Sequence, residues 1–291
     1  MKILFVMPKV GSWATHGKHV APNQLYAHWA AYIREKGYED LEVIDCKALE
    51  IPMDQMVQMI KDKNPDVVVM GEQLHSYGGY AVVAHFNESA KRIKQALPST
   101  KIILGGLWYS AMPTETLEAN PAVDYVVMGE EESFFDIIEA IDKKKNLKNV
   151  PGVTVRFDNG KISMGPYKPL LQDLDSLPLP AYDLFPMDKY VGHTHWKPFV
   201  DMVSSRGCPS ACTFCYEWDQ YDPRNPSDFL KWRAKSPERV IEEFNLLHKK
   251  YGVKVVVLQD DNFNVNPERV KKFCELKKAS NNPIKWVSLG R

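Results

Sequence analysis

The stretch Gly207-Cys208-Pro209-Ser210-Ala211-Cys212-Thr213-Phe214-Cys215 decides how the rest of the sequence is interpreted, because it carries three cysteines within eight residues. It follows the apolar run from Val200 to Ser204, which predicts a β-strand. The cysteine loop would therefore leave the carboxyl end of a strand, where barrels of parallel strands have their active sites. The chain has five cysteines, and an odd, clustered number favours metal or redox chemistry over a disulfide framework.

The spacing Cys-x3-Cys-x2-Cys predicts that Cys208, Cys212 and Cys215 hold an iron–sulfur cluster. Three thiolates on one short loop can ligate three irons of a 4Fe-4S cluster, which leaves the fourth iron without a cysteine. Such an iron can bind a substrate or a cofactor and transfer an electron to it. A structural zinc site is the alternative, but such sites use four ligands, and Cys274 lies far along the chain within an expected helix.

From Phe199 onward the sequence predicts a second α/β unit. Its expected elements are a strand at 199–204, a helix at 237–251, a strand at 253–259, a helix at 267–279 and a strand at 284–289. Ser236 and Pro237 supply an N-cap and a first helical residue. Three strands are fewer than a parallel barrel needs, so we expect the sequence to stop inside an incomplete barrel.

The first half of the chain alternates short β-rich runs with amphipathic stretches, which predicts one doubly wound domain. The strands are expected at 2–7, 41–45, 66–70, 101–104 and 125–128, and the helices at 22–35, 54–62, 81–96, 114–119 and 133–144. Ligands of such sheets bind beyond the carboxyl ends of the strands. Gly105-Gly106 and Gly129 lie at two of these ends, where a backbone without side chains lets a large ligand approach closely.

Three segments follow from these patterns: an α/β domain at 1–145, a connecting segment at 146–198 and the incomplete barrel at 199–291. Within the connecting segment, alternating polar and apolar residues flank Asn159-Gly160, which predicts a β-hairpin. The residues after the hairpin are rich in proline.

The composition excludes several partners. Lysine plus arginine number 37 and aspartate plus glutamate also number 37, so no net charge attracts nucleic acid or an anionic membrane surface. The apolar run at the start is too short for a signal peptide, and no segment approaches the roughly 20 apolar residues of a membrane span. We therefore expect a soluble, cytoplasmic protein that has no membrane span and does not bind nucleic acid.

The cysteine segment, with the aromatic Phe214 before the third cysteine, resembles the cluster loop of radical S-adenosylmethionine (radical SAM) enzymes. In that family the open iron is chelated by S-adenosylmethionine, and an electron from the cluster produces a 5′-deoxyadenosyl radical. The resemblance implies that Cys208, Cys212 and Cys215 ligate the cluster and that the backbone around Phe214 contacts adenine. It also implies an electron donor such as flavodoxin or ferredoxin.

Two later segments, 232–240 and 258–263, also resemble a subgroup of this family. The second contains Asp260 and Asp261 at the end of an expected strand. These two carboxylates either face the site or are only solvated.

The glycine signatures resemble those of the cobalamin-binding domain in B12-dependent radical SAM enzymes. The resemblance implies a Rossmann-like cobalamin-binding domain at 1–145, followed by an incomplete radical SAM (β/α) barrel. It implies that cobalamin is contacted at Gly105, Gly106, Gly129 and Glu130.

The common cobalamin motif Asp-x-His-x-x-Gly is absent, so the motif does not identify the residue that would be the lower ligand of cobalt. Neutral imidazole is a natural metal ligand, which makes His16, His19 and His75 eligible. Glu72, His75 and Ser76 are alternatively candidates for hydrogen bonds to corrin amides.

The resemblance implies an enzyme that uses a 4Fe-4S cluster, S-adenosylmethionine and cobalamin for radical methylation or ring closure on a small organic substrate. The order of motifs is similar to the anaerobic magnesium-protoporphyrin oxidative cyclase branch. A radical methylthiotransferase is an alternative, although those enzymes carry three further cysteines in the amino-terminal domain and this sequence has only Cys46 there. A non-catalytic corrinoid or metal-binding module is the other alternative.

The cysteine interpretation makes a prediction. Cys212→Ala should abolish cluster assembly during anaerobic reconstitution, because it removes one of three ligands, and visible absorbance with iron and sulfide content will measure the loss. Cys274→Ala is the matched control and should retain the cluster. Equal loss in both variants would indicate a four-cysteine metal site instead.

Overall fold

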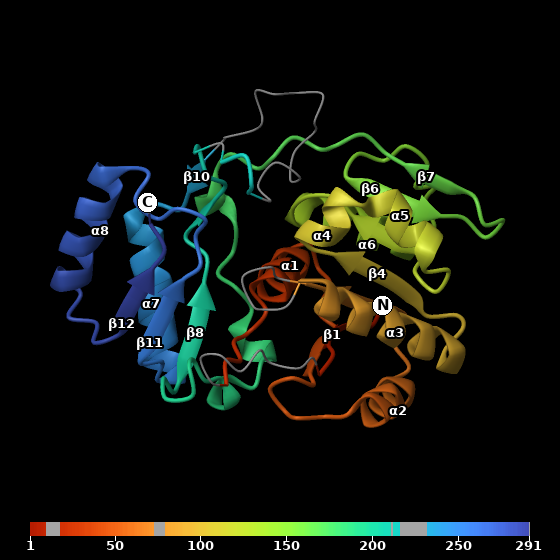
Figure 1. Ribbon diagram of the computed structural model, residues 1–291, viewed down its shortest axis with the longest axis horizontal. Helices are drawn as coiled ribbons and strands as arrows, with labels where there is room; N and C mark the ends of the chain where they lie inside the picture. Colours follow the sequence, from red (N-terminus) through yellow and green to blue (C-terminus); the bar gives the residue numbers. More distant parts are fainter. Residues whose placement is uncertain (10–17, 73–78, 211, 216–231, 291) are drawn as a thin grey trace. The chain divides into compact units, whose positions relative to one another are not determined.

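The computed structural model describes residues 1–9, 18–72, 79–210, 212–215 and 232–290 (Figure 1). The chain forms two compact units. Unit 1 consists of the described residues within Met1–Trp13, Leu25–Leu170 and Pro180–Pro186, and unit 2 consists of those within Ala14–Gln24, Leu171–Leu179 and Met187–Arg291. The connecting segment expected at 146–198 therefore contributes residues to both units.

Unit 1 contains a seven-stranded sheet in the order β2-β1-β3-β4-β5-β6-β7. Its strands are β1 (Ile3–Met7), β2 (Leu41–Asp45), β3 (Val67–Gly71), β4 (Lys101–Gly105), β5 (Tyr125–Val127), β6 (Val153–Arg156) and β7 (Ile162–Met164). The first five are parallel, whereas β6 and β7 are antiparallel to their neighbours. The order reverses between β1 and β3, and such a reversal marks the ligand-binding edge of doubly wound sheets.

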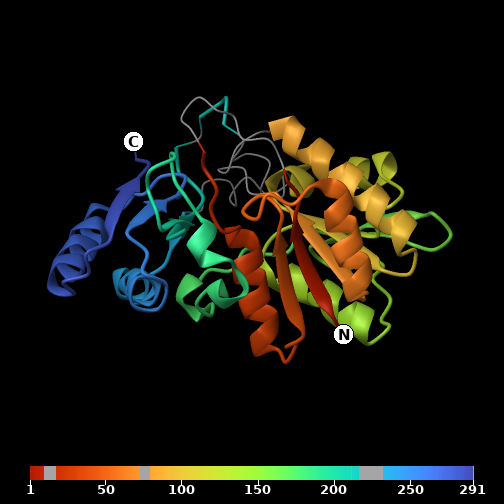
Figure 2. The same ribbon diagram turned by 90° about the horizontal axis from the view of Figure 1, so that it is seen from below.

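The helices of unit 1 cover both faces of this sheet (Figure 2). They are α1 (Gln24–Glu35), α2 (Met53–Lys63), α3 (Gly79–Ala96), α4 (Leu107–Ala111), α5 (Pro113–Ala119) and α6 (Glu131–Asp142). Helices α1 and α6 share one face, where Trp29 stacks on Phe134 with ring centroids 4.4 Å apart. Strand β3 reads Val-Val-Val-Met-Gly and is buried throughout, as expected of a central parallel strand covered on both faces.

Close packing explains part of the glycine pattern in unit 1. A Cβ on Gly105 would lie 2.3 Å from Cη2 of Trp29, and a Cβ on Gly71 would lie 2.8 Å from the carbonyl oxygen of Gly105. The indole of Trp29 is fully buried at this point. The sequence suggested that Gly105 leaves room for a ligand. The structure gives a second reason for glycine at this position, because any side chain here would clash with an aromatic residue of the protein itself.

The predicted hairpin is confirmed and extends the sheet of unit 1. Strands β6 and β7 pair in antiparallel register, with Arg156 opposite Ile162. Gly160 has a φ of +79°, which glycine adopts readily. Asn159 accepts a hydrogen bond from the backbone N–H of Lys161 at 3.0 Å, as side chains in such turns do.

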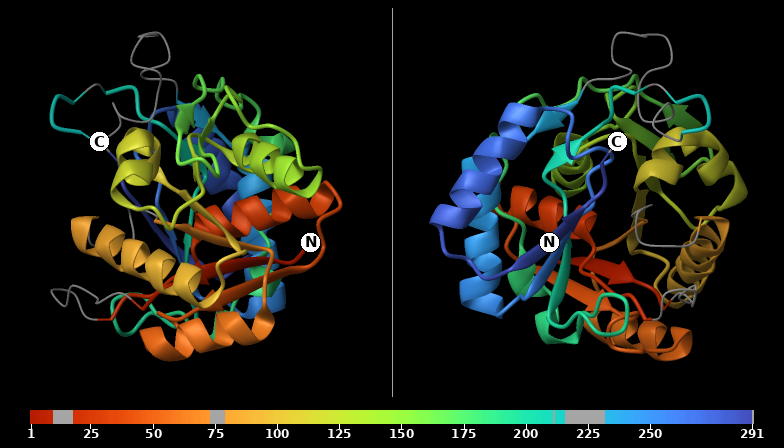
Figure 3. Two further views of the ribbon diagram at one scale, coloured as in Figure 1. Left: turned by 90° about the vertical axis from the view of Figure 1, so that its right-hand side faces the viewer. Right: turned by 60° about the vertical axis from the view of Figure 1, so that its left-hand side comes forward.

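Unit 2 contains a parallel three-stranded sheet in the order β12-β11-β8, with α7 and α8 side by side on one face (Figure 3). The elements are β8 (Phe199–Met202), α7 (Pro237–Tyr251), β11 (Val255–Leu258), α8 (Pro267–Ala279) and β12 (Lys285–Ser288). Each helix begins at a side-chain cap: Ser236 accepts from the N–H of Arg239, and Asn266 accepts from the N–H of Arg269, both at 3.1 Å.

The predicted elements agree with the structure to within about two residues at most ends, which is the usual uncertainty of helix and strand boundaries. The expected ranges of α7 and α8 coincide with the observed ones. The prediction missed α4, the short strands β9 (Ser205–Arg206) and β10 (Arg233–Ala234), and three single 3-10 turns. Those turns are η3 (Leu174–Ser176), η4 (Tyr182–Leu184) and η5 (Met187–Lys189). Within the described residues, no helix is both long enough and apolar enough to span a membrane.

The contact between Gly105 and Trp29 generates a prediction. Gly105→Ala should lower the free energy of unfolding by about 1–3 kcal/mol, because the added methyl group overpacks a filled core. In a Trp29→Phe background the same change should cost under about 1 kcal/mol, since the clashing ring is smaller. Chemical denaturation of the four proteins measures this coupling, and an equal loss in both backgrounds would contradict it.

Candidate functional site

The three clustered cysteines lie in the loop that follows β9. Cys208, Cys212 and Cys215 form no disulfide and are partly buried, and the N–H of Cys215 donates to the carbonyl of Cys212 at 3.0 Å. Phe214 is 90 % exposed. Among the described residues, no three His, Cys, Asp or Glu side chains lie in a group that could hold a metal ion. The three thiols are thus near one another in sequence but are not gathered into a metal-binding group.

The two ends of the cysteine loop are held together by a short ladder. Strands β9 and β10 pair in antiparallel fashion, with Arg233 opposite Arg206 and Ala234 opposite Ser205. Gly207 follows β9 with a φ of +81°, which turns the chain toward Cys208. The loop therefore starts and ends at one fixed place at the carboxyl end of β8.

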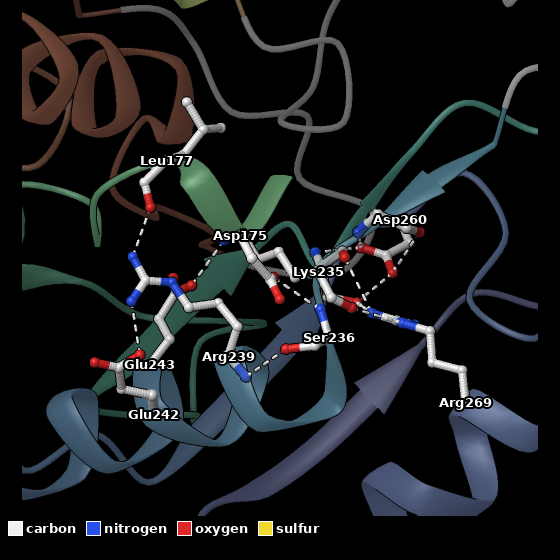
Figure 4. A network of polar contacts seen from close by, with 11 residues as sticks. Asp175, Leu177, Lys235, Ser236, Arg239, Glu242, Glu243, Asp260 and Arg269 are labelled. Carbon is white, nitrogen blue, oxygen red and sulfur yellow. Dashed lines mark hydrogen bonds and ion pairs between the residues drawn. The ribbon is translucent and has the colours of Figure 1, made fainter. Parts of the chain in front are cut away.

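A buried carboxylate fastens this place to the neighbouring strand (Figure 4). Asp260 is fully buried, two residues beyond β11. Its Oδ1 accepts the backbone N–H groups of Ser204 and Ser205, at 2.6 and 3.0 Å, and its Oδ2 accepts their two hydroxyl groups, at 2.6 and 2.8 Å. The adjacent Asp261 accepts the N–H of Gly207 at 3.1 Å. The sequence left open whether these two carboxylates face the site or are solvated, and Asp260 is buried against the two serines rather than solvated.

Arg269 of α8 completes the support of the loop. Its Nη2 donates to the carbonyl and hydroxyl oxygens of Ser204, at 3.0 and 2.9 Å, and its Nε donates to the carbonyl of Lys235 at 2.9 Å. Lys235 in turn forms a buried ion pair with Glu243 of α7 at 2.8 Å. Both helices therefore contact the chain around the cysteine loop through charged groups.

The connecting segment also contributes to this network (Figure 4). The N–H of Ser236 donates to Asp175 at 2.8 Å, and Arg239 donates to the carbonyl of Leu177 at 2.6 Å. Arg233 donates to the carbonyl of Leu171 at 2.7 Å. Residues 171–179 thus supply hydrogen-bond acceptors to the network around the cysteine loop.

Burial sets the electrostatics of these groups. It raises the pKa of the Asp260 carboxyl above its ordinary value, although the four hydrogen bonds from Ser204 and Ser205 act in the opposite direction. Burial likewise lowers the pKa of Arg269, against the attraction of Asp260. Desolvation thus disfavours the charged forms of both groups, and the hydrogen bonds from Ser204 and Ser205 offset part of this effect for Asp260.

At the carboxyl ends of β3 and β4, Glu72 and Gly106 lie close together. The carboxylate of Glu72 accepts the N–H of Trp108 at 2.5 Å, and Glu72 is 4 % exposed. Gly106 has a φ of +112°, and a Cβ there would lie 2.3 Å from the carbonyl oxygen of Glu72. We expected the Glu72 side chain to bind corrin amides. Its carboxylate already accepts a hydrogen bond from the backbone at the start of α4.

Gly129 and Glu130 precede α6. Gly129 has a φ of +120°, and a Cβ there would lie 3.4 Å from the hydroxyl of Ser133, so backbone conformation more than crowding requires glycine. Glu130 is the N-cap residue of α6 but makes no side-chain capping bond.

Within the described residues of unit 1, the polar atoms buried without a hydrogen-bond partner include Nε1 of Trp29, the hydroxyl of Tyr109, the hydroxyl of Ser133 and Nε of Arg156. Tyr109 lies three residues after Gly106 and Ser133 lies four residues after Gly129, so both hydroxyls follow the glycine signatures. Burial raises the pKa of Tyr109, and the charge of Glu72 adds to the increase. Buried donors without partners are uncommon in native proteins, so each needs an explanation.

Of the histidines eligible as a cobalt ligand, only His19 lies within the described residues; His16, His75 and the polar Ser76 fall outside them. His19 belongs to unit 2 and is 4 % exposed. Its Nε2 lies 3.0 Å from Oδ2 of Asp201 in β8, whose Oδ1 accepts from Gln259 at 3.2 Å. This ring is therefore engaged with the sheet of unit 2.

Sequence reasoning missed Arg269 and Tyr109. A signal for Arg269 was present, because α7 and α8 both begin with Pro-Glu-Arg-Val after a capping residue. The two arginines of this repeat, Arg239 and Arg269, both donate to backbone carbonyls of unit 2. No local signal marks Tyr109, because its burial depends on strands distant in the sequence.

Comparisons with known proteins agree with this architecture. Residues 21–139 match the B12 binding domain and residues 202–290 match the radical SAM superfamily. The cobalamin-dependent S-adenosylmethionine radical enzyme OxsB, with aqua-cobalamin and S-adenosylmethionine bound, superimposes with a TM-score of 0.74 at 19% identity, over 98% of this chain and 38% of that one. The radical S-adenosylmethionine methyltransferase TsrM from Kitasatospora setae gives a TM-score of 0.71 at 17% identity, over 98% of this chain and 53% of that one.

The fold is that of a Rossmann-like domain followed by part of a radical SAM (β/α) barrel, as the sequence predicted. The chain thus combines a segment that matches the B12 binding domain with a segment that matches the radical SAM superfamily.

Two curated relatives illustrate the range of this family. An uncharacterized methyltransferase of Pyrococcus horikoshii is 34% identical over 100% of this chain and 60% of its own length. The anaerobic magnesium-protoporphyrin IX monomethyl ester cyclase of Rubrivivax gelatinosus is 24% identical over 94% of this chain and 48% of its own. The chain thus spans about half the length of the curated relatives that it matches.

The Asp260 contacts generate a prediction. Asp260→Ala should lower the free energy of unfolding by at least about 3 kcal/mol, because it leaves two buried N–H groups without acceptors. Asp260→Asn should cost only about 1 kcal/mol, since its carbonyl keeps the N–H bonds and the two serine hydroxyls can rotate to accept from the amide. Denaturant unfolding of both variants measures the difference, and equal losses would contradict this account.

Proposed function

We propose that this chain is part of a cobalamin-dependent radical SAM enzyme that cleaves S-adenosylmethionine reductively at a 4Fe-4S cluster held by Cys208, Cys212 and Cys215. The observation that carries the proposal is the position of the cysteine loop. It leaves the carboxyl end of a parallel strand and is fastened there by Asp260, in a chain whose other unit matches a B12 binding domain.

The donor set suits the cluster. Three partly exposed thiols occur within eight residues, and none of them is in a disulfide. Thiolates are the usual ligands of iron–sulfur clusters, and three of them leave one iron for another ligand. With S-adenosylmethionine on that iron, the cluster would supply the electron that releases a 5′-deoxyadenosyl radical. Phe214, whose ring is exposed, is the residue that we assign to the adenine.

The edge of unit 1 suits cobalamin. The hydroxyls of Tyr109 and Ser133, which follow the glycine signatures, are buried without partners among the described residues, and a corrin with amide side chains offers acceptors to such donors. We assign the backbone at Gly105, Gly106, Gly129 and Glu130 to the same cofactor. We also propose Glu72, His75 and Ser76 as cobalamin contacts, with less support. The carboxylate of Glu72 already accepts a hydrogen bond from Trp108, which leaves it fewer positions for hydrogen bonds to a corrin.

Methyl transfer to a small organic substrate is the reaction that we favour, because the relative at 34% identity is described as a methyltransferase. Ring closure is the second candidate, supported by the similarity to the magnesium-protoporphyrin cyclase at 24% identity. A radical methylthiotransferase is not favoured, because Cys46 is the one cysteine in residues 1–145. Burial raises the pKa of its thiol to about 12, which disfavours a thiolate ligand. A non-catalytic corrinoid module is not favoured either, since the relatives are enzymes.

The proposal also assigns a role to each of three segments of the chain. Residues 1–145 bind cobalamin, residues 146–198 connect, and residues 199–291 begin the radical SAM domain. We also propose a cytoplasmic location, with a flavodoxin or ferredoxin as the electron donor.

Anaerobic reconstitution of the full-length protein with iron, sulfide and cobalamin tests this function. We expect absorbance typical of a four-iron cluster, cobalamin that survives desalting, and 5′-deoxyadenosine after reduction in the presence of S-adenosylmethionine. The Cys212→Ala protein is the control and should retain cobalamin while producing no 5′-deoxyadenosine. Failure to assemble a cluster would overturn the radical chemistry, and loss of cobalamin on desalting would overturn the role of unit 1.

A further inference from the structure

Unit 2 carries a group of lysines at the amino ends of its strands, away from the end that carries the cysteine loop. They are Lys249 and Lys250 in the last turn of α7, Lys254 just before β11, Lys278 in the last turn of α8 and Lys285 at the start of β12. All five side chains are exposed. These five residues are called the lysine rim below.

The topology of the sheet brings the lysine rim together. Strands β11 and β12 are parallel and begin opposite one another, with Val255 paired to Lys285, and the N–H of Lys285 donates to the carbonyl of Lys254 at 2.9 Å. Helix α7 leads into β11 and α8 leads into β12 through short connections, so both helices end at this edge (Figure 1). The amide of Asn282 donates to Asn245 of α7 at 2.9 Å, which joins the connection after α8 to the other helix.

The charge at this edge has one sign. Segments 245–254 and 276–285 contain no aspartate or glutamate, and Glu275, one turn before Lys278, is the acidic residue nearest to the rim in the sequence. The acidic residues of α7 pair with other cations, namely Glu238 with Lys272, Glu242 with Arg239 and Glu243 with Lys235. Within the described residues, no rim lysine forms an ion pair. The rim is therefore a local basic patch, although the charges of the whole chain balance.

Local effects account for single lysines of the rim but not for the group. Lysine in the last turn of a helix interacts favourably with the helix dipole, which accounts for Lys249, Lys250 and Lys278. Lysine on an edge strand opposes aggregation, which accounts for Lys285. Neither effect requires Lys254, and neither requires that these groups gather at one edge without a carboxylate between them.

The residue type indicates a diffuse anionic partner. The rim contains no arginine, whereas Arg239 and Arg269 lie in the first turns of the same two helices and donate to backbone carbonyls. Nucleic-acid recognition favours the planar guanidinium, and protein interfaces are depleted in lysine. The lysine ammonium is a hydrated point charge on a flexible stem, which suits attraction to many headgroups without a fixed geometry.

We infer that the lysine rim docks this protein on a lipid surface with negatively charged headgroups. The attraction is electrostatic, because segments 245–254 and 276–285 contain none of the exposed large apolar side chains. A lysine close to an anionic bilayer contributes about fivefold to the binding constant, so several together give measurable binding. The inference depends neither on the cluster nor on cobalamin.

Sedimentation with lipid vesicles tests the inference on the full-length protein without its cofactors. We expect binding to vesicles of equal parts phosphatidylcholine and phosphatidylserine, little binding to phosphatidylcholine alone, and weaker binding as added salt screens the charges. The triple variant Lys249→Gln, Lys250→Gln, Lys254→Gln should bind about 10- to 100-fold more weakly. The same three positions changed to arginine keep their charge and should bind within about threefold of the wild type.

The triple variant Lys143→Gln, Lys144→Gln, Lys145→Gln is the matched control. It removes the same net charge from an exposed run in unit 1, where Lys143 and Lys145 already pair with Glu139 at 2.6 and 2.8 Å. This variant should bind the anionic vesicles within about threefold of the wild type. Equal weakening in both triple glutamine variants would mean that net charge alone acts, which would overturn the inference.

Two further outcomes would contradict docking on lipid. One is a wild-type protein that fails to sediment with the phosphatidylserine vesicles at low salt. The other is tighter binding to duplex DNA than to these vesicles at the same ionic strength, lost in the rim variant, which would assign the lysine rim to nucleic acid. Both outcomes leave the proposed function standing, because that function is tested by cluster assembly, cobalamin retention and 5′-deoxyadenosine.

Discussion

The candidate site depends on the hydrogen bonds between Asp260 and the two serines that follow β8. The site needs a loop whose two ends are fixed while its middle is available to a ligand. Asp260 meets this requirement because β8 and β11 are neighbouring parallel strands, with Met202 opposite Leu258. The two strands end side by side, so one carboxylate reaches both serines that precede the loop. Arg269 then bonds to Ser204 from α8.

Unit 1 obeys a different constraint, which is close packing around glycine. Gly71, Gly105 and Gly106 are required because Leu25, Trp29 and Glu72 leave no space for a side chain. Their presence is therefore not evidence for a ligand by itself. The stronger evidence is chemical, namely buried hydroxyl and indole groups that nothing in the described protein satisfies.

Much of this architecture could be predicted from the sequence because its signals are local. The caps at Ser236 and Asn266, the buried Val-Val-Val run of β3 and the Asn159-Gly160 turn each specify an element within a few residues. The contacts of the site could not be predicted in this way. Asp260 meets Ser204 across 56 residues and Arg269 meets it across 65, and pairing at such separation depends on the register of the sheet. Helix α4 has only five residues, too few for a periodic pattern.

The central claim is that the cysteine loop presents an iron to S-adenosylmethionine in a chain that also binds cobalamin. Electron–nuclear double resonance on the reduced, cobalamin-loaded full-length protein, with S-adenosylmethionine labelled with nitrogen-15 at its amino group, tests this most directly. We predict a nitrogen-15 coupling to the cluster that is absent in unlabelled and ligand-free samples. A cluster spectrum that is unchanged by saturating S-adenosylmethionine would contradict the account.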